Sequence, residues 1–348
     1  MKIMIRTAEA VLDGHPDRFC DLLADAVIRE GYNVDPECYG QVEVSVWSDV
    51  IFFSGAVATR NPLKKTLEEI VIETGTAIGY TPRNHIDANR YKIVSELCLL
   101  NQDPNDFTRV VNDQSIVIGW AGYDSLTEHL PPEQFLVREF RNAVIDDIGS
   151  GLLNNHGPDG KLLVVMREDS NGFTLETVVV TIQHKSNTNL LSLAADVGSV
   201  LKTRYEALAS RDSRWRAKWK DVRVLGNPNG NLIAAGSDGD NGQTGRKLVM
   251  TFYGPRVPIG GGAIHGKDLA HIDRLAAYAT RQAAVEAVKS GAKECQITAV
   301  YSPGCDEPLE ILIDLVGRGT RPDRERFDYR RMRSEFSVPT NFFGELIR

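Results

Sequence analysis

Cysteine is scarce in this sequence, and long apolar runs are missing altogether. The five cysteines are scattered over 348 residues without a CxxC pair, which excludes a disulfide framework and a cysteine-rich zinc site and is typical of a reducing compartment. No stretch of about 18 apolar residues is present, and the first residues, MKIMIRTAEA, are charged and lack the apolar core of a signal peptide. The sequence therefore predicts a cytoplasmic protein without a membrane partner.

Positive charge is in deficit as well, because 47 acidic residues oppose 40 lysines and arginines and leave a net charge of −7. Such a chain repels nucleic acid, so nucleic acid is not an expected partner. Hydrophobic residues make up 42% and charged residues 25% of the sequence. These fractions are ordinary for a folded globular protein and exclude the disordered, collagen-like and coiled-coil classes.

A pair of neighbouring strands occurs three times in the sequence, and a helix follows the first two pairs. The first copy pairs strands at 42–47 and 50–58 and continues into a helix that Asn61 caps and Pro62 begins. The other predicted elements are strands at 162–166, 175–182, 295–301 and 309–316 and helices at 19–30, 190–201 and 271–290. Three similar α+β units follow from this pattern. We place them at residues 1–101, 112–231 and 232–348, and we expect them to pack closely or interleave because no low-complexity linker separates them.

Glycines and charged residues gather in two neighbouring stretches, NPNGNLIAAGSDGDNGQTGRK at 227–247 and GGGAIHGKD at 260–268. Together they hold nine glycines. Glycine lets backbone N–H groups approach phosphates closely, lysine and arginine neutralise phosphate charge, and carboxylates hold Mg²⁺. The two stretches therefore predict a polyphosphate site.

Three shorter polar segments leave a structural and a functional interpretation open. Residues 13–18 (DGHPDR) have the proline and aspartate of a first helical turn, but a helix cap does not account for His15 or Arg18. Residues 112–114 (NDQ) are typical of a turn, and residues 157–161 (GPDGK) of a β-turn that leads into the next strand.

A P-loop is rejected, although residues 261–267 match its GxxxxGK pattern. Asp268 follows where a P-loop has the serine or threonine that binds Mg²⁺. Pro255 and Pro258 also interrupt the segment that would have to be a buried strand.

Taken in order, the motifs resemble those of the S-adenosylmethionine synthetase (methionine adenosyltransferase) family. GHPDR is similar to the family's GHPDK, IDAN to its FDAN, and NDQSIVIGWA to its GDQGxxxGYA. GPDGK, TIQH, NPNG, DGDNGQTGRK, GGGAIHGKD and DRLAAYATR follow in the family's order, so that the resemblance covers residues 9–281. Each motif is weak alone, but their shared order makes chance resemblance implausible.

The resemblance implies a fold, a reaction and partners. The fold is three similar α+β domains of β-α-β-β-α-β type around a pseudo-threefold axis. The reaction joins the sulfur of methionine to C5′ of ATP and expels triphosphate, which is then cleaved to pyrophosphate and phosphate. It uses two Mg²⁺ ions per site and K⁺, and it takes place at the interface of a homodimer, which in some members pairs further into a tetramer.

The resemblance also assigns roles by motif position. His15 would meet the oxygen that leaves C5′, and the residues that grip phosphate would be Lys161, Arg246, Lys247 and Lys267. Asp17 and Asp273 would bind Mg²⁺, and Glu43 would bind K⁺. The remaining substrate contacts would be Asp113 and Asp240 at methionine or ribose, Gln102 at the start of a mobile loop, Leu232 at adenine, and Glu9, Asp159 and His184 nearby.

Several positions depart from the family's pattern. Ala56 stands where the family has a methionine-binding glutamate, Arg18 and His271 each replace a lysine, and Leu232 replaces a stacking phenylalanine. The segment 102–112 is shorter than the family's gating loop, and the chain ends at Arg348, before the family's C-terminal extension, so we expect looser closure over substrate. Two alternatives to an active synthetase stay open: a noncatalytic relative that binds ATP or S-adenosylmethionine, and an enzyme that only hydrolyses tripolyphosphate.

Overall fold

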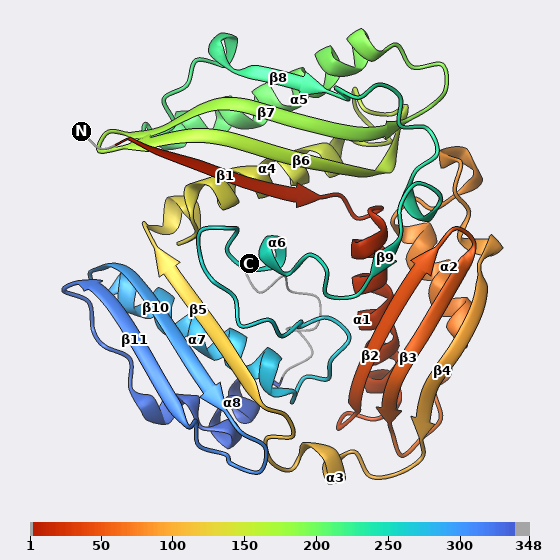
Figure 1. The fold of residues 1–348 in the computed structure, drawn as a ribbon, viewed down its shortest axis with the longest axis vertical. Coiled ribbons are helices and arrows are strands. Elements are labelled where there is room, and N and C mark those ends of the chain that lie inside the picture. Colours follow the sequence, from red (N-terminus) through yellow and green to blue (C-terminus); the bar gives the residue numbers. More distant parts are fainter. Residues whose placement is uncertain (1–2, 338–348) are drawn as a thin grey trace.

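The computed structural model describes residues 3–337 as a mixed α+β chain, which confirms the predicted fold class (Figure 1). In chain order the elements are β1 (Met4–Val11), α1 (Pro16–Val34), β2 (Tyr39–Trp47), β3 (Val50–Ala58), α2 (Leu67–Ala77), β4 (Lys92–Leu100), α3 (Asn105–Thr108), β5 (Ser115–Gly122), α4 (Pro132–Asp147), β6 (His156–Asp169), β7 (Gly172–His184), α5 (Leu190–Arg211), β8 (Arg223–Gly226), β9 (Gly242–Gln243), α6 (Leu248–Thr251), α7 (Ile272–Lys289), β10 (Ala292–Tyr301), β11 (Glu310–Gly317) and α8 (Tyr329–Phe336). Within the described range, none of the helices combines the length and apolar character needed to cross a membrane.

The strands form three sheets, in the orders β4-β3-β2-β9, β1-β6-β7-β8 and β11-β10-β5. Each sheet is built on one of the predicted hairpins, because β2 and β3, β6 and β7, and β10 and β11 pair antiparallel. In two sheets a helix then returns the chain to a parallel neighbour, so that β3 pairs with β4 and β7 with β8. Figure 1 shows the three sheets arranged around α6 and the glycine-rich loops.

The three units exchange their first strands. β1 leads into α1 but pairs with β6. β5 leads towards α4 but pairs with β10, and β9 leads towards α7 but pairs with β2. The predicted segments 1–101, 112–231 and 232–348 each contain one hairpin, and each gives one strand to the sheet of another segment. Their boundaries stay a prediction.

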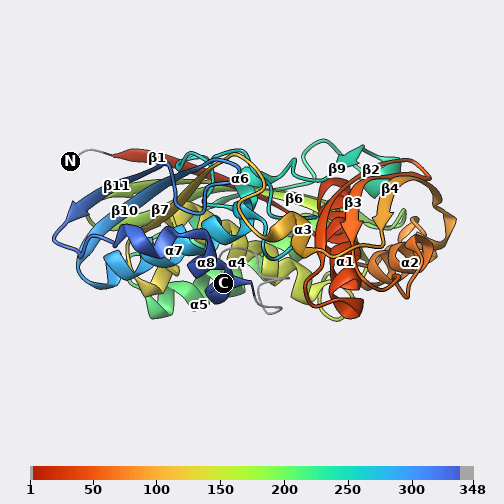
Figure 2. The same cartoon turned by 90° about the horizontal axis from the view of Figure 1, so that it is seen from below.

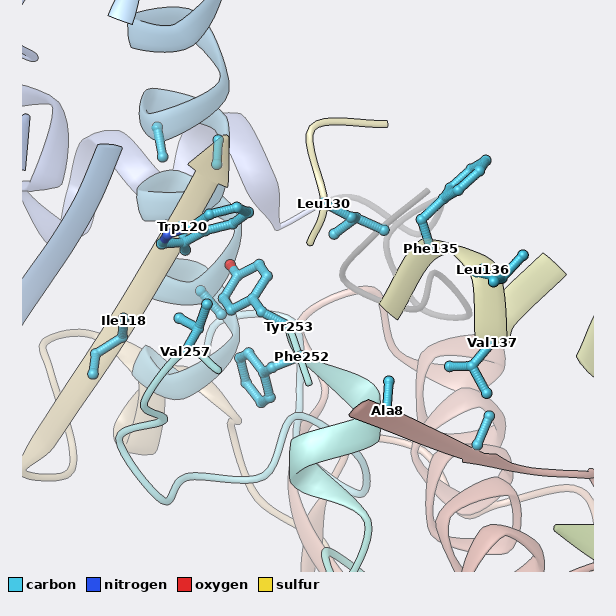
Figure 3. Close-up of a cluster of buried hydrophobic side chains, with 14 of the residues drawn as sticks. Ala8, Ile118, Trp120, Leu130, Phe135, Leu136, Val137, Phe252, Tyr253 and Val257 are labelled. Atoms are coloured by element: carbon cyan, nitrogen blue, oxygen red, sulfur yellow. The ribbon is translucent and has the colours of Figure 1, made fainter. Parts of the chain in front are cut away.

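The helices cover one face of the sheets. Figure 2 shows α2, α5 and α8 on one side of a flattened molecule, with most strands towards the other. The core has two parts, one beneath the β2 hairpin and a larger one shared by the sheets of β6 and β10. In the larger core, Trp120 of β5 packs against Tyr253, which follows α6, with ring centroids 6.3 Å apart (Figure 3). Burial of these rings fixes the glycine-rich segment around α6 against the sheet.

The prediction that α2 begins at Pro62 with Asn61 as its cap is wrong. Thr66 is the cap: its hydroxyl accepts the backbone N–H of Glu69, and the Glu69 carboxylate accepts the N–H of Thr66. This reciprocal capping box outcompetes the proline signal. The Asn61 side chain instead donates to the Val34 carbonyl at 3.1 Å, at the end of α1.

The expected β-turn at 157–161 is also wrong, because these residues belong to strand β6. The strand is irregular here, with a register shift between His156 and Gly160. The Asp159 carboxylate is buried and accepts the Gly236 N–H at 2.7 Å. A long-range contact therefore replaces the local hydrogen bonds that a turn would have made.

Candidate functional site

The start of α1 holds a neutral histidine beside a buried aspartate. His15 is the N-cap residue, and its Nδ1 accepts the backbone N–H of Asp17 at 3.2 Å. Because Nδ1 uses its lone pair in this way, the ring proton lies on Nε2. Burial, with the charge of Lys247 adding to it, lowers the pKa of His15 to about 4. The side chain is thus a hydrogen-bond donor without charge at neutral pH.

Two cations from the glycine-rich loop converge on Asp17. The carboxylate, on a side chain only 1% exposed, pairs with the Lys247 ammonium and lies 3.5 Å from Arg246 Nε. It also accepts the Gln243 N–H at 2.9 Å. The loop comes this close because residue 242 is glycine: a Cβ there would lie 2.3 Å from the Pro16 carbonyl oxygen.

Further predicted residues lie around this helix start. Lys161 on β6 is 3.5 Å from the Glu9 carboxylate on β1. Lys161 and Asp240 both lie close enough to His15 to shift its pKa. Asp159 holds the loop before Asp240 through the Gly236 N–H, and burial raises the pKa of Asp159 to about 6. We call the set His15, Asp17, Lys161, Asp240, Arg246 and Lys247 the α1 cluster.

The start of α7 repeats the arrangement with more negative charge. His271 is the N-cap residue, and its Nδ1 accepts the Asp273 N–H at 3.2 Å. The Asp273 carboxylate is 2.5 Å from Lys267 Nζ and accepts the Ser115 hydroxyl at 2.5 Å. Burial, followed by the charge of Lys267, lowers the pKa of His271 to about 4, so this residue does not replace a lysine's charge at neutral pH.

Asp113 completes this second group and makes it a possible metal site. One carboxylate oxygen each from Asp113 and Asp273 and one ring nitrogen of His271 lie within 4.8 Å of one another. Since His271 Nδ1 accepts a backbone N–H, its Nε2 carries the proton, which leaves the two carboxylates as the natural ligands for a hard cation. We call Asp113, Lys267, His271 and Asp273 the α7 cluster.

The two clusters lie at opposite ends of β2. Val46 pairs with Gly242 of the loop that reaches the α1 cluster, whereas Gln41 pairs with Lys267 of the α7 cluster. At about 3.3 Å per residue the two contact points are about 17 Å apart. The structure therefore brings the predicted cations together as two groups within one chain.

Six predicted residues are not members of either cluster. Two of them, Glu9 and Asp159, contact the α1 cluster or its loop as described above, and the other four lie elsewhere. Glu43 is exposed on β2, opposite Ser54 of β3. Leu232 is half-buried, and its N–H donates to His184 Nε2 at 3.1 Å, so the segment just after the NPNG motif contacts the TIQH motif. Gln102 is exposed before α3. Their roles stay predictions.

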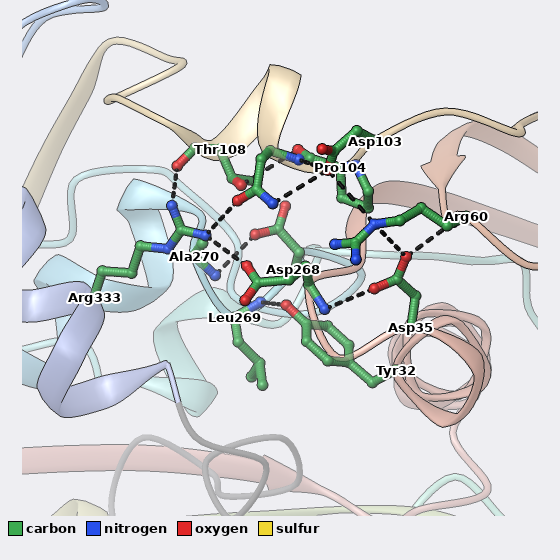
Figure 4. Close-up of polar contacts among 12 residues, drawn as sticks. Tyr32, Asp35, Arg60, Asp103, Pro104, Thr108, Asp268, Leu269, Ala270 and Arg333 are labelled. Carbon is green, nitrogen blue, oxygen red and sulfur yellow. Dashed lines mark hydrogen bonds and ion pairs between the residues drawn. The ribbon is translucent and has the colours of Figure 1, made fainter.

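The short segment at 102–112 contacts distant parts of the chain, and looser closure over substrate stays a prediction. Phe107 of α3 stacks on Tyr39 with ring centroids 4.6 Å apart. Arg333 of α8 donates to the Thr108 carbonyl at 2.7 Å, and Asp103 lies 3.6 Å from Arg60 (Figure 4). These contacts fasten both ends of α3 to distant parts of the chain.

The glycine-rich loops are held by residues that the sequence analysis missed. Asp21 and Asp25 follow Asp17 at four-residue spacing, and they accept the N–H groups of Gly245 and Gly266, each at 2.9 Å. The spacing of the three aspartates along one predicted helix was the available signal.

Comparison with known proteins identifies the family. The model of the S-adenosylmethionine synthetase N-terminal domain matches residues 3–102, and that of the C-terminal domain matches residues 234–339. The S-adenosylmethionine synthase of Acholeplasma laidlawii is 31% identical over 330 residues, which cover 90% of this chain and 82% of that protein. The chain belongs to the S-adenosylmethionine synthetase family. Other members include the synthases of Parvibaculum lavamentivorans, 32% identical over 329 residues, and Staphylococcus epidermidis, 29% identical over 336 residues, each again covering 90% of this chain and at least 80% of the relative. The resemblance stated from the motifs is confirmed.

Proposed function

We propose that this protein is a methionine adenosyltransferase that forms S-adenosylmethionine from ATP and methionine. The observation that carries the proposal is the α1 cluster, in which an uncharged N–H donor, His15, lies beside Lys247 and Arg246. A donor next to fixed cations is what a departing polyphosphate needs. Membership of the synthetase family supports the same reaction.

The sulfur of a thioether carries no proton, so its attack on C5′ needs no general base. A lone pair on sulfur forms the S–C5′ bond while the C5′–O bond breaks and its electrons leave with the triphosphate. The protein's task is to align the two reactants and to stabilise charge on the leaving oxygen. His15 suits this role because its ring is neutral above about pH 5 and carries its proton on Nε2, from where it can donate a hydrogen bond to that oxygen.

The remaining cations and carboxylates have roles around the triphosphate. Lys161, Lys247, Arg246 and Lys267 would neutralise its oxygens. Asp113 and Asp273 fit Mg²⁺, because two carboxylates with oxygens less than 4.8 Å apart match the preference of hard cations for oxygen ligands. When bound, Mg²⁺ supplies further charge neutralisation at the phosphates. Asp17 is proposed to bind the second Mg²⁺ ion. For this, the Lys247 ammonium would have to turn away from the Asp17 carboxylate and towards the phosphates.

Two copies of the chain are part of this proposal. Within one chain, the segments that carry the two clusters pair with β2 at points about 17 Å apart, which favours a site completed by a second copy. The open face of the β2 sheet exposes Trp47 (59%), Phe52 (36%) and Val94 (47%), which is an apolar surface suited to a partner. In a homodimer, each site would combine the α1 cluster of one copy with the α7 cluster of the other. Glu43 on the same face would bind K⁺ at the interface, and a tetramer would be a pair of such dimers.

The test is product formation by purified protein given ATP, Mg²⁺, K⁺ and a series of methionine analogues, read by mass spectrometry. The series matters because Ala56 supplies no carboxylate for the amino group of methionine. We expect a sulfonium product with at least one thioether amino acid, lost in Lys161→Ala and kept in the control Lys202→Ala, whose side chain is 51% exposed on α5. Phosphate release from tripolyphosphate without any sulfonium product would identify a tripolyphosphatase instead, and ATP binding without turnover a noncatalytic relative.

A further inference from the structure

His265 is buried, and it contacts Arg18, which follows Asp17 of the α1 cluster, while lying two residues before Lys267 of the α7 cluster. It is 5% exposed and directly precedes Gly266 and Lys267 of the α7 cluster. Its Nδ1 is 2.7 Å from the Asp25 carboxylate of α1, and its Nε2 is 3.1 Å from Nη1 of Arg18, one residue after Asp17. The imidazole thus joins the loop of the α7 cluster to the first turn of α1.

The contacts of His265 determine where its proton lies. An arginine can only donate hydrogen bonds, so Arg18 must donate to the lone pair of Nε2. Nδ1 therefore carries the proton and donates it to Asp25. A second proton on Nε2 would set two donors against each other at 3.1 Å. The arrangement requires a neutral ring of one defined tautomer.

The surroundings hold the ring in this orientation. Asp25 is 4% exposed and accepts the Gly266 N–H at 2.9 Å, and Arg274 Nη1 lies 3.5 Å from the same carboxylate. Asp25 and Arg274 hence fix the acceptor on one side of His265. Arg18, on the other side, lines a small cavity of about 30 Å³ together with Lys247 of the α1 cluster. The Arg18 guanidinium, whose Nε also lies 3.7 Å from the Asp13 carboxylate, and Lys247, which pairs with Asp17, thus line the same cavity.

We propose that His265 is a positioning residue: it accepts a hydrogen bond from Arg18, aims the guanidinium towards the polyphosphate-binding side of the α1 cluster, and so couples that cluster to the Lys267 loop. The proposal rests on the proposed function, since it takes polyphosphate as the ligand of the α1 cluster. Arg18 contributes a further cation for that ligand, and His265 acts only through Arg18.

Two substitutions separate the contacts of His265. His265→Asn places its amide near the position of Nδ1 and keeps a donor for Asp25, but it has no acceptor that reaches Arg18. His265→Gln places its carbonyl oxygen near the position of Nε2 and keeps the acceptor for Arg18. If His265 acts by orienting Arg18, the Gln variant retains function and the Asn variant does not, although both remove the imidazole.

The experiment is calorimetric titration of the full chain with tripolyphosphate and Mg²⁺, together with the melting temperature of each variant. We expect the dissociation constant to rise about tenfold in His265→Asn and in Arg18→Gln, and no further in the double variant, because the two residues act as one unit. His265→Gln should bind within about threefold of the unsubstituted chain. Independent, multiplying losses in the double variant, equal losses in the Asn and Gln variants, or no loss in either would overturn the proposal. A fall in melting temperature that parallels the loss of binding across all variants would also overturn it.

This readout is separate from that of the proposed function. Binding of tripolyphosphate is measured without methionine and without turnover. A chain that binds tripolyphosphate through the Arg18–His265 pair but forms no sulfonium product would contradict the proposed reaction and leave this inference standing.

Discussion

The starts of α1 and α7 are built alike but differ in the charge around them. Each has a histidine N-cap whose Nδ1 accepts a backbone N–H at 3.2 Å, and each places a buried aspartate two residues later. At α1 the aspartate faces two cations, Lys247 and Arg246. At α7 it faces one, Lys267, and the carboxylate of Asp113 lies nearby. The same backbone arrangement thus has two cations around its aspartate at the first helix, and one cation and a second carboxylate at the second helix.

The start of α4 has a buried acidic residue at the same position, but aromatic rings cover its cation. Pro131 replaces the histidine cap, and Glu133 occupies the position of the aspartates, 1% exposed. Its cation is Arg256, which lies 3.8 Å away and packs over the rings of Trp120 and Tyr123 at 5.2 and 5.3 Å. Aromatic rings cover this arginine, whereas Lys247 and Lys267 lie on glycine-rich loops. We interpret the third helix start as structural.

The largest expected effect comes from substituting the lysines at the starts of α1 and α7 in separate variants. Lys247→Ala and Lys267→Ala should each lower product formation by at least 100-fold as single variants, since each removes a cation from the leaving triphosphate. When the two variant chains are coexpressed, half of the dimers are mixed, and one of the two sites in each mixed dimer has both lysines. Activity should then recover to about a quarter of that of the unsubstituted protein. No recovery in verified mixed dimers would mean that one chain provides a complete site.

The ion pair at the start of α4 should contribute to the free energy of unfolding. Arg256→Ala leaves the buried Glu133 carboxylate without its cation, and we expect a loss of about 3 kcal/mol in the free energy of unfolding. Urea denaturation measures this, with Arg330→Ala as the control, because that arginine is 76% exposed and its pair with Asp306 should contribute less than about 1 kcal/mol. Equal losses in both variants would remove the distinction between the α4 start and the surface.

The acidic character of the α7 start predicts divalent-cation binding. Mn²⁺ titration followed by electron paramagnetic resonance should give a dissociation constant about tenfold higher in Asp113→Asn, because one of two carboxylate ligands is lost. Asp106→Asn is a matched control on α3, where the side chain is 59% exposed beside Arg109. Unchanged Mn²⁺ affinity in Asp113→Asn would contradict the metal assignment.

A further difference at the α7 start concerns pH. Burial and Lys267 lower the pKa of His271 from 6.5 to about 4, so between these values the unfolded chain binds a proton that the folded chain does not. The stability that neutral His271 contributes is complete above pH 6.5 and is lost as the pH falls, by up to about 2 kcal/mol at pH 5. His271→Asn keeps a cap acceptor without titrating. Its unfolding free energy should therefore fall less between pH 7 and pH 5, and an equal fall in both proteins would show that His271 is not the source.

Much of the local structure could be predicted from residue patterns. Alternating apolar residues were sufficient to predict the strands β2, β3, β6 and β7, and helical spacing was sufficient for the helices α1, α5 and α7. Each pattern shows which side of a single element is buried. Motif order was sufficient for the family. Local signals failed where two of them competed, as at Asn61 and Thr66, and where a distant partner decided the conformation, as for Asp159 and Gly236.

The sequence by itself determined the types of element, the family and the list of chemically capable side chains. The tertiary structure alone decided that these side chains form two groups whose backbone segments pair with β2 at points about 17 Å apart, that both cap histidines are uncharged, and that His265 joins Arg18 to Asp25. The physical reason is that charge state and grouping depend on burial and on contacts between residues far apart in the chain. Arg18 and His265 are 247 positions apart, and no local pattern encodes their contact.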